Sequence, residues 1–226
     1  MKKVIKIIIH PFYKHYHFWI HKNPRKYRYK NVYTIVHPGV FSPKNTLSTK
    51  VFLEYLSIMN LKDKKVLELG CGSGIIAIYS ASKGAKVLAT DINKVALKSL
   101  KEVSIDQGLN VETTYSDLFD EIIKTDFDYI FINPPYYPKN PKNIEEKAWF
   151  CGENFEYFEK LFVQLTPIIS KNTTVLMILS DECDYKTISN ISKEKNLMLD
   201  RIHVKKLLLE TNYIYRIKKE NIAIID

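Results

Sequence analysis

The feature that most constrains the fold is a regular alternation of short apolar segments with helix-length segments between residues 65 and 195. Strands separated by helices of roughly 10 to 15 residues are typical of βαβ units, whose crossovers are right-handed. The pattern therefore predicts an α/β fold with a doubly wound, Rossmann-like and mostly parallel sheet. The expected parallel strands are residues 65–69, 86–90, 111–115, 127–132 and 174–179.

The expected helices are 75–82, 93–107, 153–170 and 184–195. A further helix precedes the first of these strands, capped by Ser48 or Thr49 and running to about Met59. Two closing strands at 199–208 and 211–218 are expected to pair antiparallel, which completes a sheet of seven strands. Hydrophobic residues make up 46% of the chain and charged residues 26%, a composition that excludes a disordered chain, a collagen, a disulfide scaffold and a coiled coil.

The positive charge of the chain is concentrated near its start. Residues 1–50 contain nine Lys and two Arg and no acidic residue, together with nine aromatic residues and five of the six histidines. Such a segment predicts contact of residues 1–36 with RNA or the ribosome, contact with an anionic membrane surface, or simple packing on the domain. His17 and His21 have helical spacing, but no Cys or carboxylate lies near them to complete a metal site, so no metal is expected.

A change of composition near residues 43–50 divides the chain into a basic aromatic arm and hairpin, 1–45, and an α/β domain, 46–226. Within the arm, residues 26–36 predict a short hairpin that turns at Lys30-Asn31. No run approaches the roughly 20 apolar residues of a membrane span, and no small-residue cleavage site follows the apolar start. Three cysteines favour free thiols, so we expect a cytoplasmic location.

A Gly-rich turn follows the strand at 65–69. Its sequence runs from Glu68 through Gly70, Cys71 and Gly72 to Gly74. Glycines allow a sharp turn and a close approach of a ligand to the backbone, and the helix that follows presents free N–H groups. In an open α/β sheet, ligands bind beyond the carboxyl ends of the strands, which is where this turn lies.

Two acidic residues end the following strands. Asp91, 21 residues after Gly70, precedes Ile92 and can accept both hydroxyls of a ribose. Asp117, followed by Leu118, lies where a carboxylate could reach the amino group of an adenine. A nicotinamide cofactor would suit the turn and the first of these acids. However, the glycines are spaced G-x-G-x-G rather than G-x-G-x-x-G, and the preceding Glu68 would repel a pyrophosphate while suiting a cationic ligand such as S-adenosyl-L-methionine.

The most specific motif is Asn133-Pro134-Pro135-Tyr136, at the end of the strand at 127–132. A planar nitrogen is a poor nucleophile because its lone pair is delocalised. The side-chain carbonyl of Asn133 and the backbone carbonyl of Pro134 can each accept one of its N–H groups, which orients the nitrogen and stabilises developing charge. The prolines restrict the backbone, and Tyr136 offers a face for stacking.

The segments VLELGCGSG, TDIN and NPPY make residues 39–216 resemble the Asn-Pro-Pro-Tyr branch of the class I methyltransferases. This branch includes release-factor glutamine methyltransferases and the small-domain guanine-N2 and adenine-N6 enzymes. The resemblance implies that S-adenosyl-L-methionine binds to the residues of the turn and strand ends described above. It also implies a cofactor contact for Asn133. The segment Val40-Phe41-Ser42-Pro43, with Thr49 ahead of VFLEYL, is similar to the glutamine enzymes and implies a position near the cofactor for Thr49. Ala148-Trp149 followed by Gly152 resembles the glutamine enzymes, whereas residues 38–42 are also similar to the guanine-N2 enzymes.

Together these features predict an S-adenosylmethionine-dependent N-methyltransferase. The expected acceptor is a protein glutamine amide of the release-factor type, and the alternative is a guanine-N2 or adenine-N6 position in ribosomal or transfer RNA. Expected cofactor residues are Thr49, Glu68, Gly70, Cys71, Gly72, Gly74, Asp91, Ile92, Asp117, Leu118 and Asn133, and expected catalytic residues are Asn133, Pro134, Pro135 and Tyr136. A non-enzyme alternative is a catalytically inactive scaffold that binds RNA or the ribosome.

Overall fold

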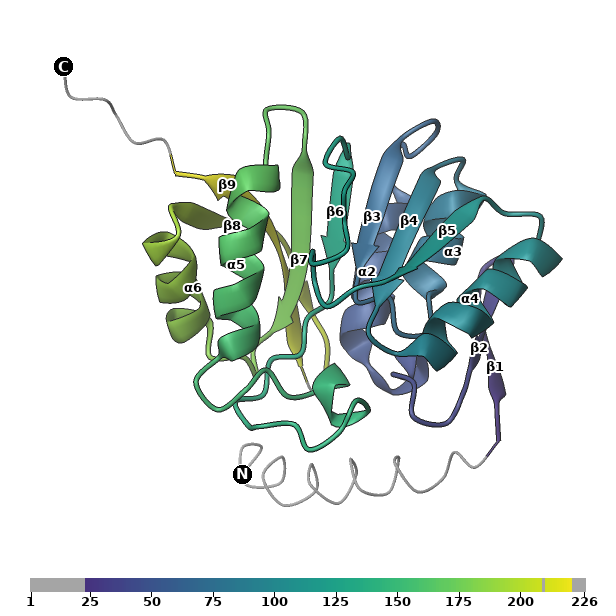
Figure 1. The fold of residues 1–226 in the computed structure, drawn as a ribbon, viewed down its shortest axis with the longest axis horizontal. Coiled ribbons are helices and arrows are strands. Elements are labelled where there is room, and N and C mark those ends of the chain that lie inside the picture. Colours follow the sequence, from purple (N-terminus) through teal and green to yellow (C-terminus); the bar gives the residue numbers. More distant parts are fainter. Residues whose placement is uncertain (1–22, 209, 221–226) are drawn as a thin grey trace.

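The computed structural model describes residues 23–208 and 210–220, and its centre is a seven-stranded sheet in the order β5-β4-β3-β6-β7-β9-β8 (Figure 1). The first five strands are parallel, and β9 runs antiparallel to both of its neighbours. The predicted α/β class and the mostly parallel sheet are confirmed. The strands are β3 (Lys65–Leu69), β4 (Lys86–Asp91), β5 (Val111–Tyr115), β6 (Tyr129–Ile132), β7 (Thr174–Ser180), β8 (Leu197–Lys206) and β9 (Thr211–Lys219).

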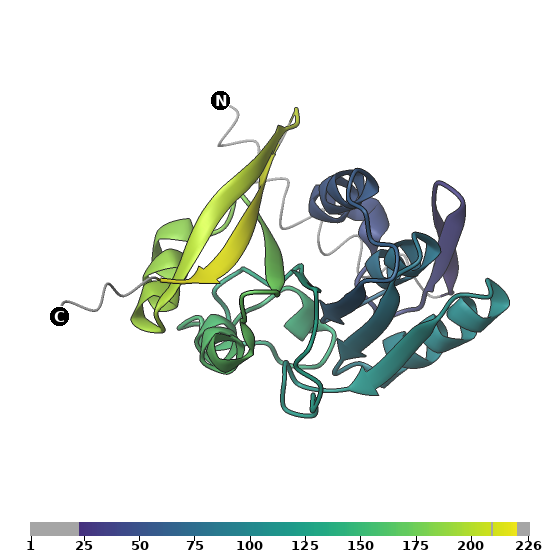
Figure 2. The same cartoon turned by 90° about the horizontal axis from the view of Figure 1, so that it is seen from above.

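Helices cover both faces of this sheet (Figure 2). On one face lie α2 (Leu47–Ser57), α3 (Ile75–Ser82) and α4 (Lys94–Asp106), and on the other lie α5 (Glu156–Ile168) and α6 (Tyr185–Glu194). Each face therefore has its own hydrophobic core. Two short 3-10 turns, η1 (Pro43–Asn45) and η2 (Glu146–Ala148), lie in the connecting loops. None of the described helices combines the length and the apolar character needed to cross a bilayer.

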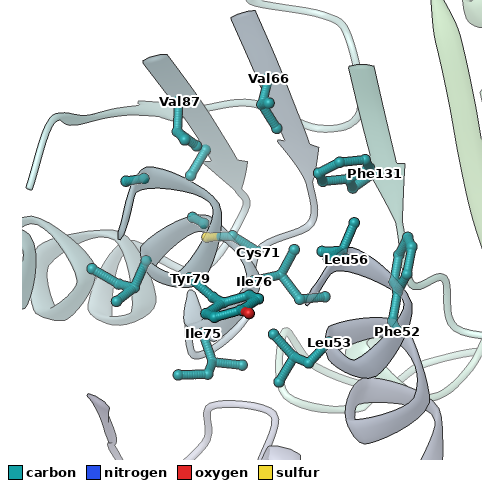
Figure 3. Close-up of a cluster of buried hydrophobic side chains, with 14 of the residues drawn as sticks. Phe52, Leu53, Leu56, Val66, Cys71, Ile75, Ile76, Tyr79, Val87 and Phe131 are labelled. Carbon is teal, nitrogen blue, oxygen red and sulfur yellow. The ribbon is translucent and has the colours of Figure 1, made fainter. Parts of the chain in front are cut away.

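The core on the α2 and α3 face joins the helix before the sheet to the sheet itself. Figure 3 shows Phe52 and Leu56 of α2 pointing toward Phe131 of β6. The rings of Phe52 and Phe131 meet edge to face, with centroids 5.7 Å apart, and both side chains are fully buried. Aromatic pairs of this geometry add stability beyond their buried area. This contact holds α2, and with it Thr49, against β6, the strand that Asn133 directly follows.

Several predicted boundaries are corrected. Helix α2 begins at Leu47 after Thr46, so the prediction that Ser48 or Thr49 caps it is wrong; both lie inside its first turn. Helix α5 begins at Glu156 because Phe155 has a φ of 62°, which helical backbone does not allow. Strand β6 begins at Tyr129, the first residue that pairs with β3. In contrast, α3 occupies the predicted residues 75–82.

The predicted hairpin is confirmed as β1 (Arg25–Tyr29) and β2 (Val32–Val36), joined at Lys30-Asn31. It packs on α3 and α4: the side chain of Gln107 accepts from the Tyr33 N–H at 3.1 Å and donates to the Tyr33 carbonyl at 2.9 Å. Thr34 donates to the Ser73 carbonyl in the Gly-rich turn. A domain boundary at residue 45 stays a prediction. Residues 1–22 of the arm, with the pair His17 and His21, lie outside the described residues.

Candidate active site

A cavity of about 460 Å³ opens at the carboxyl ends of the parallel strands. Its volume is in the usual range for small-ligand pockets, and its position is where an open parallel sheet binds ligands. The structure therefore brings together predicted site residues that the sequence places up to 87 positions apart. Its wall includes the predicted residues Thr49, Glu68, Gly70, Cys71, Gly72, Asp91, Ile92, Asp117, Leu118, Asn133, Pro134, Pro135 and Tyr136.

The turn after β3 is built from glycines with positive φ. Gly70 and Gly72 have φ values of 70° and 50°, and both line the cavity. Gly74, also predicted to bind the cofactor, does not line it. A Cβ atom at Gly74 would lie 2.5 Å from a methyl carbon of Leu100. The close approach of α3 to α4, together with a φ of 72°, is a structural reason for glycine at this position.

Glu68 lies at the bottom of the cavity, only 5% exposed, and its Oε2 accepts from the Ala77 N–H of α3 at 2.7 Å. Burial raises the pKa of Glu68 to about 8; the nearby Asp91 contributes in the same direction, and the Ala77 N–H opposes them. The carboxyl group is therefore mainly neutral at pH 7 in this environment. A cation placed beside it would favour the ionised form.

Asp91, the last residue of β4, forms a hydrogen bond with the Gly-rich turn. Its Oδ2 accepts from the Gly72 N–H at 2.7 Å, and its Oδ1 accepts from the Asn93 N–H at 2.8 Å. Burial raises the pKa of Asp91, and these backbone donors oppose the rise. Each carboxylate oxygen can accept more than one hydrogen bond, so Asp91 retains capacity for two ligand hydroxyls.

The turn that carries Asp117 is held by a residue that the sequence analysis did not single out. Lys160 of α5 lines the cavity and its Nζ lies 3.2 Å from Asp117 and 2.7 Å from Asp120. Leu118, which follows Asp117, is buried with a φ of 56°. A lysine on a surface helix carries no sequence signal for this role, because the contact depends on how α5 packs.

Asn133 is oriented by a neighbour from α2. Its Nδ2 donates to Thr49 Oγ1 at 3.3 Å, and Thr49 Oγ1 lies 3.2 Å from the hydroxyl of Thr46. Within the described residues, no hydrogen bond engages Asn133 Oδ1. The sequence predicts Thr49 at the cofactor. In the structure its hydroxyl forms hydrogen bonds with Asn133 and Thr46. Its contact leaves the carbonyl end of the Asn133 amide available for another donor.

Tyr136 and Tyr137 form the next part of the wall, with ring centroids 4.7 Å apart. Burial raises the pKa of the Tyr136 hydroxyl, and a hydrogen bond with Ser180 opposes the rise. The Tyr137 hydroxyl donates to Glu182 at 2.5 Å. Both phenols are therefore neutral at ordinary pH, and Tyr136 offers the cavity a flat ring rather than a charge.

The loop after Tyr136 returns to close the cavity. Tyr137 and Trp149 are joined by a backbone hydrogen bond of 3.2 Å, and the Cys151 N–H donates to the Tyr137 carbonyl at 3.0 Å. This arrangement places Trp149 against Phe41, with ring centroids 5.0 Å apart. Both rings line the cavity. Their segments were noted in the sequence, but their contact across more than 100 residues was not predicted.

Among the described residues, no group of three or more His, Cys, Asp or Glu side chains is arranged to hold a metal ion. The cysteines Cys71, Cys151 and Cys183 are free thiols. Burial raises the pKa of Cys151 to about 11 and raises that of Cys71 as well, so neither is a thiolate at neutral pH. The cavity wall offers carboxyl, amide, hydroxyl and backbone groups, together with the ammonium group of Lys160.

Comparison with known proteins agrees with this geometry. The family model "Methyltransferase small domain" matches residues 31–149. A Methanocaldococcus jannaschii relative named "Putative protein N5-glutamine methyltransferase" is 38% identical over 104 residues, which cover 46% of this chain and 50% of the relative. Ribosomal RNA small subunit methyltransferase C of Haemophilus influenzae is 39% identical over 102 residues, 44% of this chain and 30% of that protein.

The chain thus spans at most half the length of these two curated relatives. Its fold is similar to that of a 16S rRNA N2 methyltransferase from T. thermophilus, solved in complex with AdoMet and guanosine. The TM-score is 0.62 at 17% sequence identity, and the match covers 86% of this chain and 50% of the other. Likeness at this level of identity establishes the fold.

The raised pKa of Glu68 has a consequence for stability. Between the ordinary pKa of 4.5 and the native value of about 8, the native state holds a proton that the unfolded chain releases. The free energy of unfolding should therefore fall as pH rises through this window. Glu68→Gln removes the titration and keeps an acceptor for the Ala77 N–H, so the variant should gain stability relative to wild type from pH 5 to pH 8.

Urea unfolding at several pH values measures this difference. Glu102→Gln, at a side chain that is 64% exposed, serves as the control and should follow the wild-type curve. Parallel pH curves for wild type and Glu68→Gln would show that Glu68 titrates normally in the folded protein.

Proposed function

The chain belongs to the methyltransferase small domain family, and on that premise we propose that it transfers a methyl group from S-adenosylmethionine to a glutamine side-chain amide of a protein release factor. The orientation of Asn133 is the observation that most directly supports transfer to a planar nitrogen. Thr49 accepts from its Nδ2 at 3.3 Å, so its Oδ1 is available to accept an N–H group of the methyl acceptor. The backbone carbonyl of the buried Pro134 lies next in the chain, on the same cavity wall.

The residues present suit this cofactor. Glu68 is a buried carboxyl group without a cationic partner among the described residues, which suits a ligand that carries positive charge. Asp91 retains acceptor capacity for the two ribose hydroxyls, and Asp117 can accept from the adenine amine. Ile92 and Leu118 supply apolar wall beside them, and Gly70, Cys71 and Gly72 supply backbone. When bound, S-adenosylmethionine supplies an activated methyl group on a sulfonium.

The chain's own contribution to the reaction is to orient a planar nitrogen and to stabilise charge. Asn133 Oδ1 and the Pro134 carbonyl each accept one N–H of the amide, which directs the nitrogen along the line of transfer. As the nitrogen becomes positive, its N–H groups become stronger donors, so both bonds strengthen. Tyr136 offers its face to the flat acceptor. No strong general base is needed, because the proton can leave after methyl transfer.

Glutamine is favoured as the acceptor by one relative and one structural feature. The M. jannaschii relative is named for N5-glutamine methylation, and its similarity covers half of its own length. In addition, Trp149, whose segment resembles the glutamine enzymes, meets Phe41, whose segment resembles both kinds of enzyme, on the cavity wall. Their rings, together with that of Tyr136, suit a narrow planar group such as an amide.

A nucleobase amine in RNA is the second candidate, and the hairpin favours it. Lys26 and Arg28 alternate along β1 and are exposed, with their cations 3.6 Å and 5.7 Å from the centroid of the Tyr33 ring. Cations along one strand suit a phosphate backbone. The named activity of the H. influenzae relative is also on ribosomal RNA.

Transfer of labelled methyl from S-adenosylmethionine distinguishes these candidates. Release factor, ribosomal subunits and bulk transfer RNA, all from cells that lack the gene, are offered in parallel. Label on a release-factor glutamine is the expected result. Label confined to RNA would overturn glutamine as the acceptor and favour the second candidate, and no label on any of the three would contradict both.

Replacing Asn133 with Ala should lower turnover by about 10²-fold or more, because it removes an acceptor that stabilises the transition state. Binding of S-adenosylmethionine should change little. Single-turnover kinetics and calorimetry measure the two effects. Asn140→Ala, an exposed residue on the same cavity, is the matched control and should keep near wild-type turnover. Retained activity in Asn133→Ala would exclude the proposed mechanism.

Thr49→Val should lower kcat by roughly tenfold, because the Asn133 amide loses the acceptor that fixes its orientation. Valine keeps the shape of the threonine side chain, so folding and cofactor affinity should be preserved. Thr49→Ser keeps the hydroxyl and should restore most of the activity. Equal kcat values for the Val and Ser variants would mean that Thr49 does not position Asn133.

If the second candidate is correct, RNA affinity should fall steeply as salt concentration rises, because binding releases counterions. Lys26→Ala with Arg28→Ala should then weaken binding and reduce the slope of log affinity against log salt by about two. Filter binding at several salt concentrations measures this. The control is Lys62→Ala with Lys86→Ala. Both lysines are exposed and lie near the amino ends of the parallel strands, away from the cavity. An unchanged slope would assign the hairpin a packing role.

A further inference from the structure

A network of side chains from α5 holds the turn that carries Asp117. Lys160 Nζ lies 3.2 Å from Asp117 Oδ2 and 2.7 Å from Asp120 Oδ2. One helical turn later, Gln164 donates from Nε2 to Asp120 Oδ1 at 2.5 Å and accepts from the Phe119 N–H at 3.1 Å. Two residues on one face of α5 therefore contact three residues of a single turn: Asp117, Phe119 and Asp120.

This turn has a backbone that needs such support. Leu118, between Asp117 and Phe119, has a φ of 56°, which is unfavourable for a residue with a branched side chain. Conformations of this kind persist where surrounding contacts over-determine them. Ser116 contributes from inside the turn: its hydroxyl donates to the Leu118 carbonyl at 2.8 Å and accepts from the Glu121 N–H at 3.1 Å. The direction of the Asp117 side chain is thus set by its own turn and by α5.

The charge state of this network is stable. Burial would lower the pKa of Lys160, but the bonds to Asp120 and Asp117 outweigh burial, so its pKa is raised. The bond from Lys160, supported by Gln164, lowers the pKa of Asp120. Both shifts favour an ion pair between Lys160 and Asp120 at neutral pH. Asp117 Oδ2 is engaged by Lys160, and no hydrogen bond engages Asp117 Oδ1 within the described part of the chain.

We propose that Lys160, supported by Gln164, is a positioning residue that determines which nucleobase the cofactor pocket accepts. By holding one oxygen of Asp117, Lys160 directs the other oxygen toward the exocyclic amine of adenine. This inference rests on the proposed use of S-adenosylmethionine. It assigns the selectivity for adenine to the orientation of the carboxylate rather than to its presence alone.

The chemistry of the base makes the proposal testable. Adenine presents an amine at carbon 6, which donates to a carboxylate, whereas hypoxanthine presents a carbonyl there. A fixed carboxylate accepts from the first and opposes the second. Sites built to bond a particular polar group reject analogues that lack it because their own groups are then left unpaired. A carboxylate that is free to rotate toward water loses this discrimination.

The test compares two ligands that share the same ribose and homocysteine groups. One carries adenine, with an amine at carbon 6, and the other carries hypoxanthine, with a carbonyl there. Dissociation constants of S-adenosyl-L-homocysteine and S-inosyl-L-homocysteine are measured by calorimetry on the whole chain, which requires no methyl acceptor. Wild type should prefer the adenosyl ligand by about tenfold or more. Lys160→Met should reduce that preference to about threefold or less, and Lys160→Arg, which keeps a cation, should restore most of it.

Lys195→Met is the matched control. Lys195 forms a 3.0 Å ion pair with Glu159, a residue of α5. The side chains of this pair are about as exposed as those of Lys160 and Asp117, but Lys195 does not line the cavity. This variant should keep the wild-type preference, which separates loss of an α5 ion pair from loss of the contact to Asp117. Gln164→Met should reduce the preference to a value between those of wild type and Lys160→Met.

The outcomes are distinct. If Lys160→Met weakens both ligands equally, or weakens neither, Lys160 does not set base selectivity and the inference is overturned. If the wild-type protein binds neither ligand, the proposed cofactor itself is wrong, and the inference fails with it. A preference that falls in Lys160→Met and returns in Lys160→Arg supports the positioning role.

Discussion

The register of β3 between its two parallel neighbours is the constraint on which the rest of the site depends. Leu69, the last residue of β3, pairs with Thr90 of β4 and with Ile132 of β6. The next residues along these strands therefore lie at one level, at the carboxyl edge of the sheet. They are Gly70, Asp91 and Asn133, which belong to the three motifs of the cavity. A shift of one residue in either pairing would turn the strand's side chains to opposite faces and separate these groups.

The site is held together by acidic groups that accept backbone N–H donors. Glu68 accepts from α3, and Asp91 accepts from the Gly-rich turn and from the start of α4. These bonds satisfy buried carboxyl oxygens that would otherwise be costly. The same carboxyl groups remain able to interact with a ligand that is cationic and rich in hydroxyls. One set of contacts thus shapes the turn and places these carboxyl groups on the cavity wall.

Most of the scaffold could be predicted from local patterns. Short runs of strand-forming residues, each bounded by turn residues, place β3, β4, β5 and β7 within about one residue of their observed bounds. The boundaries that differed depend on contacts at a distance. The start of β6 is set by its pairing with Val66, and the start of α5 follows from a left-handed residue, Phe155, that is buried against the core. Neither condition is visible in the neighbouring sequence.

The sequence by itself determined the class of the fold, the identity of the motifs and their positions at strand ends, because periodicity and glycine placement are local properties. Only the tertiary structure decided how the motifs are completed. Thr49 orients Asn133 from α2, Trp149 meets Phe41, and Lys160 holds Asp117 from α5. Gly74 lies where α3 packs closely against Leu100 of α4. Each of these contacts joins elements that are distant along the chain, and side-chain packing alone sets which residues face one another.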